Sequence, residues 1–116
     1  CKNAIAVNSC TNGIFATLSA LDIKKGDEII TSPLTFISTI NTLYQFGMKI
    51  KLVDINLKDK NIDIDKLKKK ITKKTKLLLI THYGGLPCDL DEIYSICRKK
   101  LFLRLGSIYI ETFKKR

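Results

Sequence analysis

The chain has 116 residues, of which 45% are apolar and 28% are charged, and 21 basic against 11 acidic side chains give a formal net charge of +10. This length suits one domain, and the composition is typical of a packed globular chain rather than a disordered or fibrous one. The longest wholly aliphatic run, Leu77 to Ile80, is far below the roughly 20 residues of a membrane span, and no signal-like segment begins the sequence. These features argue against membrane insertion and secretion and favour a cytoplasmic location.

Hydrophobic periodicity predicts strands that alternate with helices. In chain order we expect a short buried strand at 4–8, a helix at 11–22, strands at 28–31 and 49–55 on either side of a helix at 35–46, a short helix at about 63–70, a strand at 76–81 and a helix at about 89–100. Apolar spacing would bury one face of the first helix, formed by Ile14, Phe15, Leu18 and Leu21.

Strands that are apolar throughout are typical of parallel sheets, whose two faces are both covered by helices. The alternation therefore predicts an α/β fold with a mostly parallel sheet and flanking helices. Cys1 runs directly into the first predicted strand, so we expect the chain to start inside a fold. The four cysteines show no Cys-x-x-Cys pair, which gives a zinc site no support and favours free thiols.

The basic excess is concentrated, since eleven lysines and four aspartates lie between Lys49 and Lys76. Nucleic-acid surfaces usually mix in arginine and aromatic residues. The cluster around Leu67 contains only lysines, at positions 66, 68, 69 and 70, which favours a solvated helix face. A small basic nucleic-acid-binding module stays the alternative from another class.

Ligands of open parallel sheets bind beyond the carboxyl ends of the strands, so the joints after strands are the places to search. The first joint, residues 8–13, holds Ser9, Cys10, Thr11 and Asn12 at a helix start, where phosphate could bind or a side chain could simply cap the helix. In the second joint, Phe36 follows Pro33 and could stack on a flat ring or belong to the core.

The third joint places His82 and Tyr83 beside two glycines. His82 could contact a ligand there, although a histidine without a carboxylate or cysteine partner is more often structural.

Taken together, the joints resemble a known family. The runs that carry the resemblance are Val7-Asn8-Ser9-Cys10-Thr11-Asn12-Gly13, Lys25-Gly26-Asp27-Glu28-Ile29-Ile30-Thr31-Ser32-Pro33-Leu34-Thr35-Phe36, Val53-Asp54-Ile55, Asn61-Ile62-Asp63, Ile71-Thr72-Lys73-Lys74-Thr75-Lys76 and His82-Tyr83-Gly84-Gly85-Leu86-Pro87-Cys88-Asp89. In order and spacing, residues 3–100 resemble the DegT/DnrJ/StrS family of pyridoxal-phosphate-dependent sugar aminotransferases. The resemblance implies part of the large domain of the aspartate-aminotransferase fold (fold type I) and leaves residues 101–116 as a divergent tail.

The resemblance also implies roles for single residues. Thr11 and Asn12 fall on the positions that bind the cofactor phosphate, and Phe36 falls on the aromatic position that stacks against the pyridine ring. Cys10 stands where the family usually has glycine or alanine. By the same resemblance, Ser9, Cys10, Pro33, His82 and Tyr83 are candidates for the edge of the active site.

The resemblance fails after Lys100. With residues 101–103 aligned onto the family's next strand, Gly106 stands where an aspartate should pair with the pyridinium nitrogen, and the chain ends before the lysine that attaches the cofactor. We therefore expect no catalytic residue in this chain, which would be inactive alone, and a truncation or frameshift behind its ending.

The complete enzyme that the resemblance implies moves an amino group, usually from glutamate, onto a nucleotide-linked keto-sugar for polysaccharide or amino-sugar synthesis, and works as a homodimer. The dehydratase variant of the same family stays open, because the residue that separates the two is absent from this chain.

Overall fold

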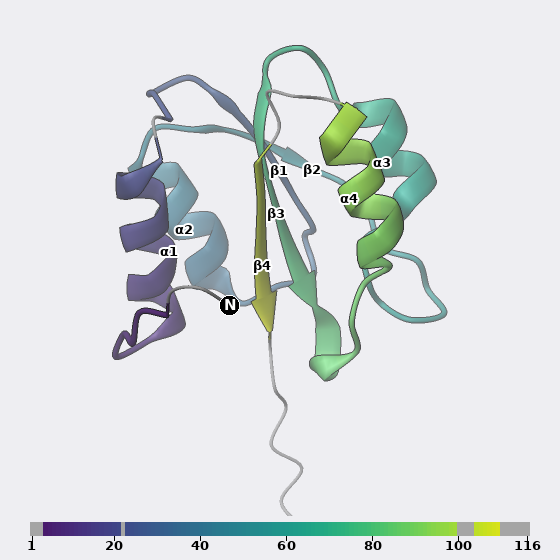
Figure 1. The fold of residues 1–116 in the computed structure, drawn as a ribbon, viewed down its shortest axis with the longest axis horizontal. Helices are drawn as coiled ribbons and strands as arrows, with labels where there is room; N and C mark the ends of the chain where they lie inside the picture. The colour runs from purple at the N-terminus through teal and green to yellow at the C-terminus, as the bar shows by residue number, and fades with distance from the viewer. Residues whose placement is uncertain (1–3, 22, 100–103, 110–116) are drawn as a thin grey trace, which may run out of the picture.

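A parallel sheet with helices on both faces forms the framework (Figure 1). In the computed structural model, which describes residues 4–21, 23–99 and 104–109, four strands pair in the order β2-β1-β3-β4, all parallel. The elements are α1 (Cys10–Ala20), β1 (Glu28–Thr31), α2 (Ile37–Gln45), β2 (Lys49–Leu52), α3 (Ile64–Lys70), β3 (Thr75–His82), a 3-10 turn at Tyr83–Gly85, α4 (Leu90–Lys99) and β4 (Arg104–Tyr109). The predicted α/β class and parallel sheet are confirmed.

Two apolar layers hold the helices to the sheet. On one face, Ile29 and Leu77 of the strands are buried against Ile14 and Leu18 of α1 and Leu43 of α2. On the other face, the buried side chains are Ile30, Leu78 and Ile80 from the strands with Leu67, Ile93 and Cys97 from α3 and α4. Successive strand residues thus face opposite layers, which explains why β1 and β3 are apolar almost throughout.

Most predicted elements are found within two or three residues of their expected bounds. The strand at 28–31 is reproduced, and the short helix near 63–70 starts after Asp63, whose carboxylate accepts a 2.9 Å hydrogen bond from the backbone N–H of Lys66. The third strand ends at Leu52 rather than at residue 55, because Asp54 already bonds to the N–H of the next residue in the following loop.

The predicted first strand is wrong. Residues 4–8 are not a strand and lie at the surface, with Ile5 88% and Val7 48% exposed. A strand needs a neighbour for its backbone hydrogen bonds, and among the described residues the sheet ends at β2 and β4. Phe15 was also expected in the core but is 39% exposed. Its ring packs edge-to-face against that of Phe46, with the two ring centroids 4.9 Å apart.

The strand expected at 101–103 lies outside the described residues. The structure instead has β4 at Arg104–Tyr109, with Gly106 in the middle of the strand beside Leu79. Gly106 thus lies within a strand, and its match to the family's aspartate position stays a prediction. None of the helices in the described ranges combines the length and apolar character needed to cross a membrane.

Candidate functional site

The carboxyl ends of the strands form one edge of the sheet, and the candidate residues gather there. β1 ends at Thr31 and β3 ends at His82, and Figure 1 shows α1 and α2 starting from this same lower edge. Helices that run back antiparallel to parallel strands necessarily point their amino ends at this edge. The edge therefore combines strand-end side chains with the positive ends of two helices.

At the start of α1, side chains arrange the first turn. Ser9 is the N-cap, and its hydroxyl accepts a 3.2 Å hydrogen bond from the backbone N–H of Asn12. The side-chain amide of Asn12 donates to Asn8 Oδ1 at 2.6 Å. Gly13 N–H makes the first intrahelical bond, to Ser9 O at 3.0 Å, so the N–H groups of Cys10 and Thr11 precede it at the helix end.

The joint between β1 and α2 presents an aromatic ring. Phe36 is the N-cap residue of α2, in an extended conformation (φ −67°, ψ 140°), and makes no side-chain capping bond. Its side chain is 66% exposed, and Pro33 in the preceding turn is exposed as well. Ser, Thr, Asp or Asn is preferred at this position, and the Phe36 ring supplies no capping hydrogen bond to the helix.

Three hydroxyls connect the end of β3 to the start of α2. Thr81 Oγ1 donates to Thr35 Oγ1 at 3.0 Å, and Thr35 Oγ1 lies 3.1 Å from Thr39 Oγ1. Thr81 and Thr39 are 2% and 1% exposed. Sequence reasoning missed this contact because threonine at a strand end carries no signal of a partner 46 residues away.

His82 is enclosed at the end of β3. It is fully buried, and its Nδ1 accepts a 2.9 Å hydrogen bond from the backbone N–H of Cys88. Burial lowers the pKa of His82, so the neutral ring is favoured. Tyr83, the next residue, is 39% exposed at the same edge. The Nδ1 contact is a structural one, and contact between His82 and a ligand stays a prediction.

Asn61 fastens the loop that follows His82. Its side chain accepts a 3.0 Å hydrogen bond from Tyr83 N–H and donates to Leu86 O at 3.1 Å and Pro87 O at 3.4 Å. The loop turns through positive φ at Gly84 and Gly85, values that glycine adopts without strain. Asn61 had no predicted role, although the run Asn61-Ile62-Asp63 belongs to the segments that carry the family resemblance.

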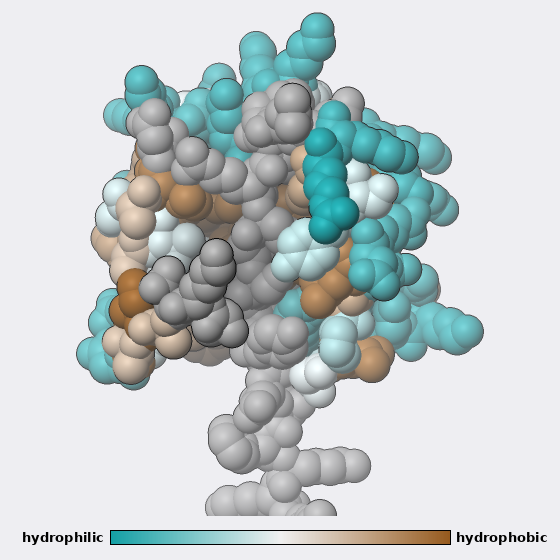
Figure 2. Space-filling view, in the orientation of Figure 1, coloured by the Kyte–Doolittle hydropathy of each residue, from teal (hydrophilic) through white to brown (hydrophobic). Residues whose placement is uncertain are grey.

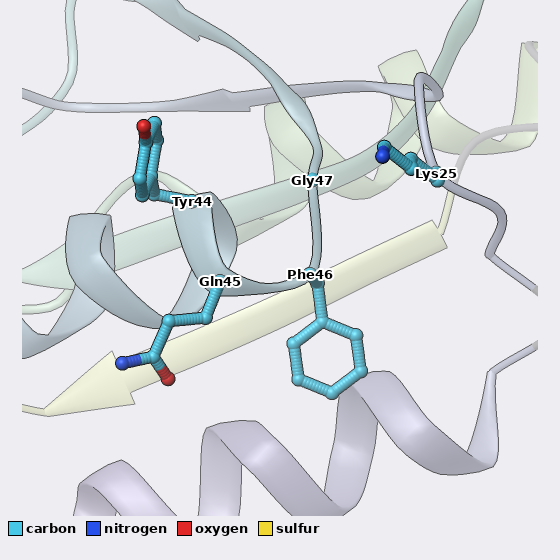
Figure 3. Close-up of a pocket in the computed structure, with 5 residues that line it drawn as sticks. All are labelled: Lys25, Tyr44, Gln45, Phe46 and Gly47. Carbon is cyan, nitrogen blue, oxygen red and sulfur yellow. The ribbon is translucent and has the colours of Figure 1, made fainter.

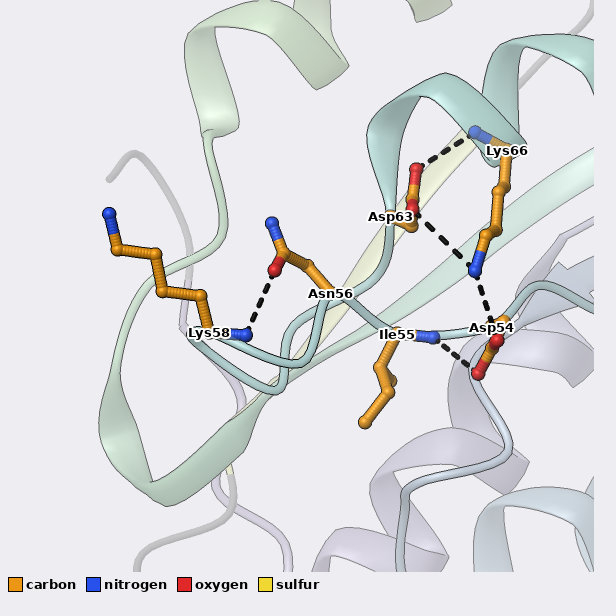
Figure 4. Close-up of polar contacts among 6 residues, drawn as sticks. All are labelled: Asp54, Ile55, Asn56, Lys58, Asp63 and Lys66. Carbon is orange, nitrogen blue, oxygen red and sulfur yellow. Dashed lines mark hydrogen bonds and ion pairs between the residues drawn. The ribbon is translucent and has the colours of Figure 1, made fainter.

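The lysines of α3 are engaged by nearby carboxylates. Lys66 Nζ lies 3.0 Å from Asp54 Oδ2 and 3.7 Å from Asp63 Oδ2 (Figure 4), and Lys68 pairs with Glu92 of α4. Hydrophilic side chains cover the side of the molecule that carries α3 and α4 (Figure 2). Two of the four lysines are thus partly neutralised, which supports the solvated-face interpretation over a nucleic-acid patch.

The polar contacts in Figure 4 continue into the loop before α3. Asn56 Oδ1 accepts a 2.9 Å hydrogen bond from the N–H of Lys58, and Asp54 Oδ1 accepts one of the same length from Ile55 N–H. The paired ammonium of Lys66 lowers the pKa of Asp54. These exposed contacts shape the loop and bring no carboxylate to the candidate site.

A hollow of about 430 Å³ lies at the opposite edge of the sheet, lined by Lys25, Tyr44, Gln45, Phe46 and Gly47 (Figure 3). Gly47 leads directly into the start of β2, so this hollow is far along the strands from Phe36 and Thr11. Lys25 is the one charged side chain among its lining residues. It therefore forms no part of the candidate site.

The candidate residues thus fall into three groups at one edge. Ser9, Cys10, Thr11 and Asn12 share the start of α1, Pro33 and Phe36 share the joint before α2, and His82 and Tyr83 end β3. All except Thr11, which is half-buried, and His82 are exposed. In the described part of the chain, no three His, Cys, Asp or Glu side chains lie close enough together to hold a metal ion.

Solved structures share the fold. A GDP-4-keto-6-deoxymannose-3-dehydratase with a trapped PLP-glutamate geminal diamine superposes with a TM-score of 0.82 at 34% identity, over 87% of this chain and 28% of that enzyme. A putative sugar aminotransferase from Streptococcus pneumoniae in its PMP form gives a TM-score of 0.75 at 30% identity, over 80% and 24% of the two chains. Both are enzymes that use a pyridoxal cofactor, and the fold is that of fold type I.

Curated relatives lead to the same group. The spore coat polysaccharide biosynthesis protein SpsC of Bacillus subtilis is 45% identical over 97 residues, and an uncharacterized protein of Methanocaldococcus jannaschii is 43% identical over the same length. The chain spans about a quarter of the length of these relatives. The model of the DegT/DnrJ/EryC1/StrS aminotransferase family matches residues 1–103. The chain therefore belongs to this family of pyridoxal-phosphate-dependent sugar aminotransferases and dehydratases.

Proposed function

We propose that the chain forms the cofactor-binding part, within the large domain, of a cytoplasmic homodimeric enzyme that moves an amino group from glutamate onto a nucleotide-linked keto-sugar. The likeness to a spore coat polysaccharide protein supports polysaccharide synthesis as the setting. The observation that carries the proposal is the exposed Phe36 ring at the same edge as the open start of α1. An anion site beside an aromatic surface suits a phosphorylated planar ring.

The residues present fit pyridoxal phosphate. Thr11 contributes a hydroxyl and Asn12 an amide at the positive end of α1, where the first N–H groups have no intrahelical acceptor. Phe36 contributes an apolar surface that loses its contact with water when a flat ring covers it. When bound, the cofactor supplies an electron-withdrawing ring that stabilises negative charge on the substrate carbon.

The roles of this chain's residues are binding and orientation. The phosphate contacts at Thr11 and Asn12 fix one end of the cofactor, while Phe36 fixes the tilt of its ring. We propose that the chain is inactive on its own, since the family's attaching lysine and its pyridinium-pairing aspartate are not among its residues. The dehydratase reaction is the second candidate, because a dehydratase is among the similar structures.

A titration with pyridoxal phosphate, followed by absorbance and fluorescence, tests the binding site. We expect weak saturable binding that Asn12→Ala and Phe36→Ala each weaken about fivefold or more. The matched control is Asn41→Ala, an exposed asparagine of α2 outside the site. Pyridoxal without phosphate should bind less tightly and lose its sensitivity to Asn12→Ala. Equal affinity of all variants for pyridoxal phosphate would contradict the proposed binding site.

Borohydride reduction of the chain mixed with pyridoxal phosphate, followed by mapping of the labelled residues, tests the proposal that the isolated chain is inactive. We expect scattered and substoichiometric labelling of surface lysines. Stoichiometric labelling of one lysine together with amino transfer to a nucleotide-linked keto-sugar would overturn it.

A further inference from the structure

An aromatic ring serves as a stacking surface only if its backbone is held in place. Phe36 receives no such support from its own side chain, which is 66% exposed and makes no capping bond. The turn before it is fastened locally, since Leu34 N–H donates to Ser32 Oγ at 3.2 Å and Thr35 N–H donates to Pro33 O at 3.2 Å. These contacts lie within the segment and do not tie it to the sheet.

The tie to the sheet is the hydroxyl of Thr81. It donates to Thr35 Oγ1 at 3.0 Å, and Thr35 directly precedes Phe36. Thr35 in turn bonds to Thr39, whose N–H donates to Phe36 O at 3.0 Å in the first turn of α2. These hydrogen bonds therefore involve residues on both sides of Phe36 and connect this segment to the carboxyl end of the buried strand β3.

The end of β3 is itself fixed. The carbonyl of Thr81 accepts a 3.4 Å hydrogen bond from the thiol of Cys88, and the adjacent His82 ring accepts the Cys88 N–H. Thr81 is 2% exposed, so its hydroxyl bond is shielded from competition by water. The backbone at the end of β3, from which the Thr81 hydroxyl projects, is therefore held in place.

We propose that Thr81 is a positioning residue for the cofactor ring: through Thr35, its hydroxyl holds Phe36 in the orientation in which the ring stacks. This inference rests on the proposed function for the identity of the stacked group. It concerns the ring only and leaves the phosphate contacts at α1 unchanged.

The chain offers a matched control at the neighbouring strand. Thr31 ends β1 on the same face of the sheet as Thr81, is fully buried, and its hydroxyl has no hydrogen-bond partner among the described residues. Thr31→Val and Thr81→Val therefore make the same isosteric change at the same depth. Only the second removes a hydrogen bond.

The first measurement is independent of the cofactor. Amide hydrogen exchange of residues 37–39 and NMR relaxation of the Phe36 ring report how firmly the start of α2 is held. We expect Thr81→Val to increase both exchange and ring motion, and Thr81→Ser and Thr31→Val to leave them as in the unsubstituted chain. Unchanged exchange and ring motion in Thr81→Val would overturn the proposal. If Thr81→Val fails to fold, Thr35→Val breaks the same bond and is judged by the same outcomes.

The second measurement is affinity. Thr81→Val should weaken the binding of pyridoxal phosphate and of pyridoxal by the same factor, about fivefold, because it acts on the ring and not on the phosphate. Combined with Phe36→Ala it should add nothing, whereas a general loss of stability would add to that variant's effect. Additive losses would overturn the positioning role. If the unsubstituted chain binds neither compound, the proposed function fails, and the exchange and relaxation data still decide whether Thr81 holds Phe36.

Discussion

Lys51 of β2 and Glu28 of β1 form an ion pair across the sheet, with Lys51 Nζ 2.8 Å from Glu28 Oε2. The other carboxylate oxygen accepts hydrogen bonds from Thr72, at 2.9 Å, and from Thr75. Glu28 is 7% exposed, so a charge lies at the amino end of the sheet with each of its oxygens bonded. The carboxylate thereby joins β1, β2 and the start of β3.

Replacing this carboxylate should destabilise the sheet. Glu28→Gln keeps the shape but removes the charge that Lys51 faces, and we expect a loss of about 1–3 kcal/mol in the free energy of unfolding. Urea unfolding followed by circular dichroism at low protein concentration measures it. Asp54→Asn is the control, since its pair with Lys66 is exposed on both sides and should matter far less. Equal losses in the two variants would contradict the assignment.

Lowering the pH should reduce the free energy of unfolding in two separate pH ranges. Burial alone would raise the pKa of Glu28, but the bonds from Lys51, Thr75 and Thr72 outweigh it and lower this pKa below 4.5. Its stabilisation is therefore complete above about pH 4.5 and is lost as the pH falls through the folded-state pKa. In Glu28→Gln, the loss of stability below pH 4.5 should be smaller than in the unsubstituted chain.

His82 should cause the loss of stability in the higher of the two pH ranges. Burial lowers its pKa below 6.5, so the unfolded state takes up a proton first and stability falls as the pH drops below about 6.5. His82 is the one histidine in the sequence, which makes the assignment direct. Stability curves between pH 7.5 and 5 should flatten in His82→Asn, whose side-chain oxygen can still accept from Cys88 N–H. An unchanged slope in this variant would show that another group titrates.

The fold could be predicted where local pattern and packing agree. Ile29 and Ile30 of β1 face opposite apolar layers, so their run predicted a strand buried on both faces. Residues 4–8 have an equally strand-like pattern, yet Ile5 is 88% exposed, because a strand also depends on a neighbour that its own residues do not specify. The start of α1 and Phe36 were predictable from the joints. The bonds of Thr81 and Asn61 were not, since they link residues 46 and 22 or more positions apart.

Asn61 should control the loop that follows His82. Asn61→Ala removes the acceptor of Tyr83 N–H and the donor to Leu86 O in a site that is 3% exposed, and we expect a loss of about 1–3 kcal/mol. Amide hydrogen exchange should accelerate at Tyr83 and Leu86 before it accelerates in β3. Asn56→Ala is the control, because Asn56 is an exposed asparagine in the loop before α3, the loop that also contains Asn61. If Tyr83 exchanges at the same rate in both variants, Asn61 does not fasten the loop.

The isolated chain should associate with other copies of itself. Ile5 and Val7 border an apolar hollow of about 300 Å³ against α1, lined also by Ala16, Ala20 and Leu21. Such exposed apolar surface favours association, because contact between copies removes it from water. The edge strand β2 is less prone to this, since Lys49 and Lys51 place charge along it. We therefore expect the association to run through residues 4–8.

Light scattering after size-exclusion chromatography, as a function of concentration, measures this association. Ile5→Lys should shift the distribution toward monomer, because a charge would have to be buried in each contact. Leu57→Lys replaces another highly exposed aliphatic residue, 77% accessible in the loop before α3, and should leave the distribution unchanged. An unsubstituted chain that stays a monodisperse monomer and melts in one sharp transition would contradict the prediction. Equal shifts in the two variants would show that net charge, rather than the surface around Ile5, governs association.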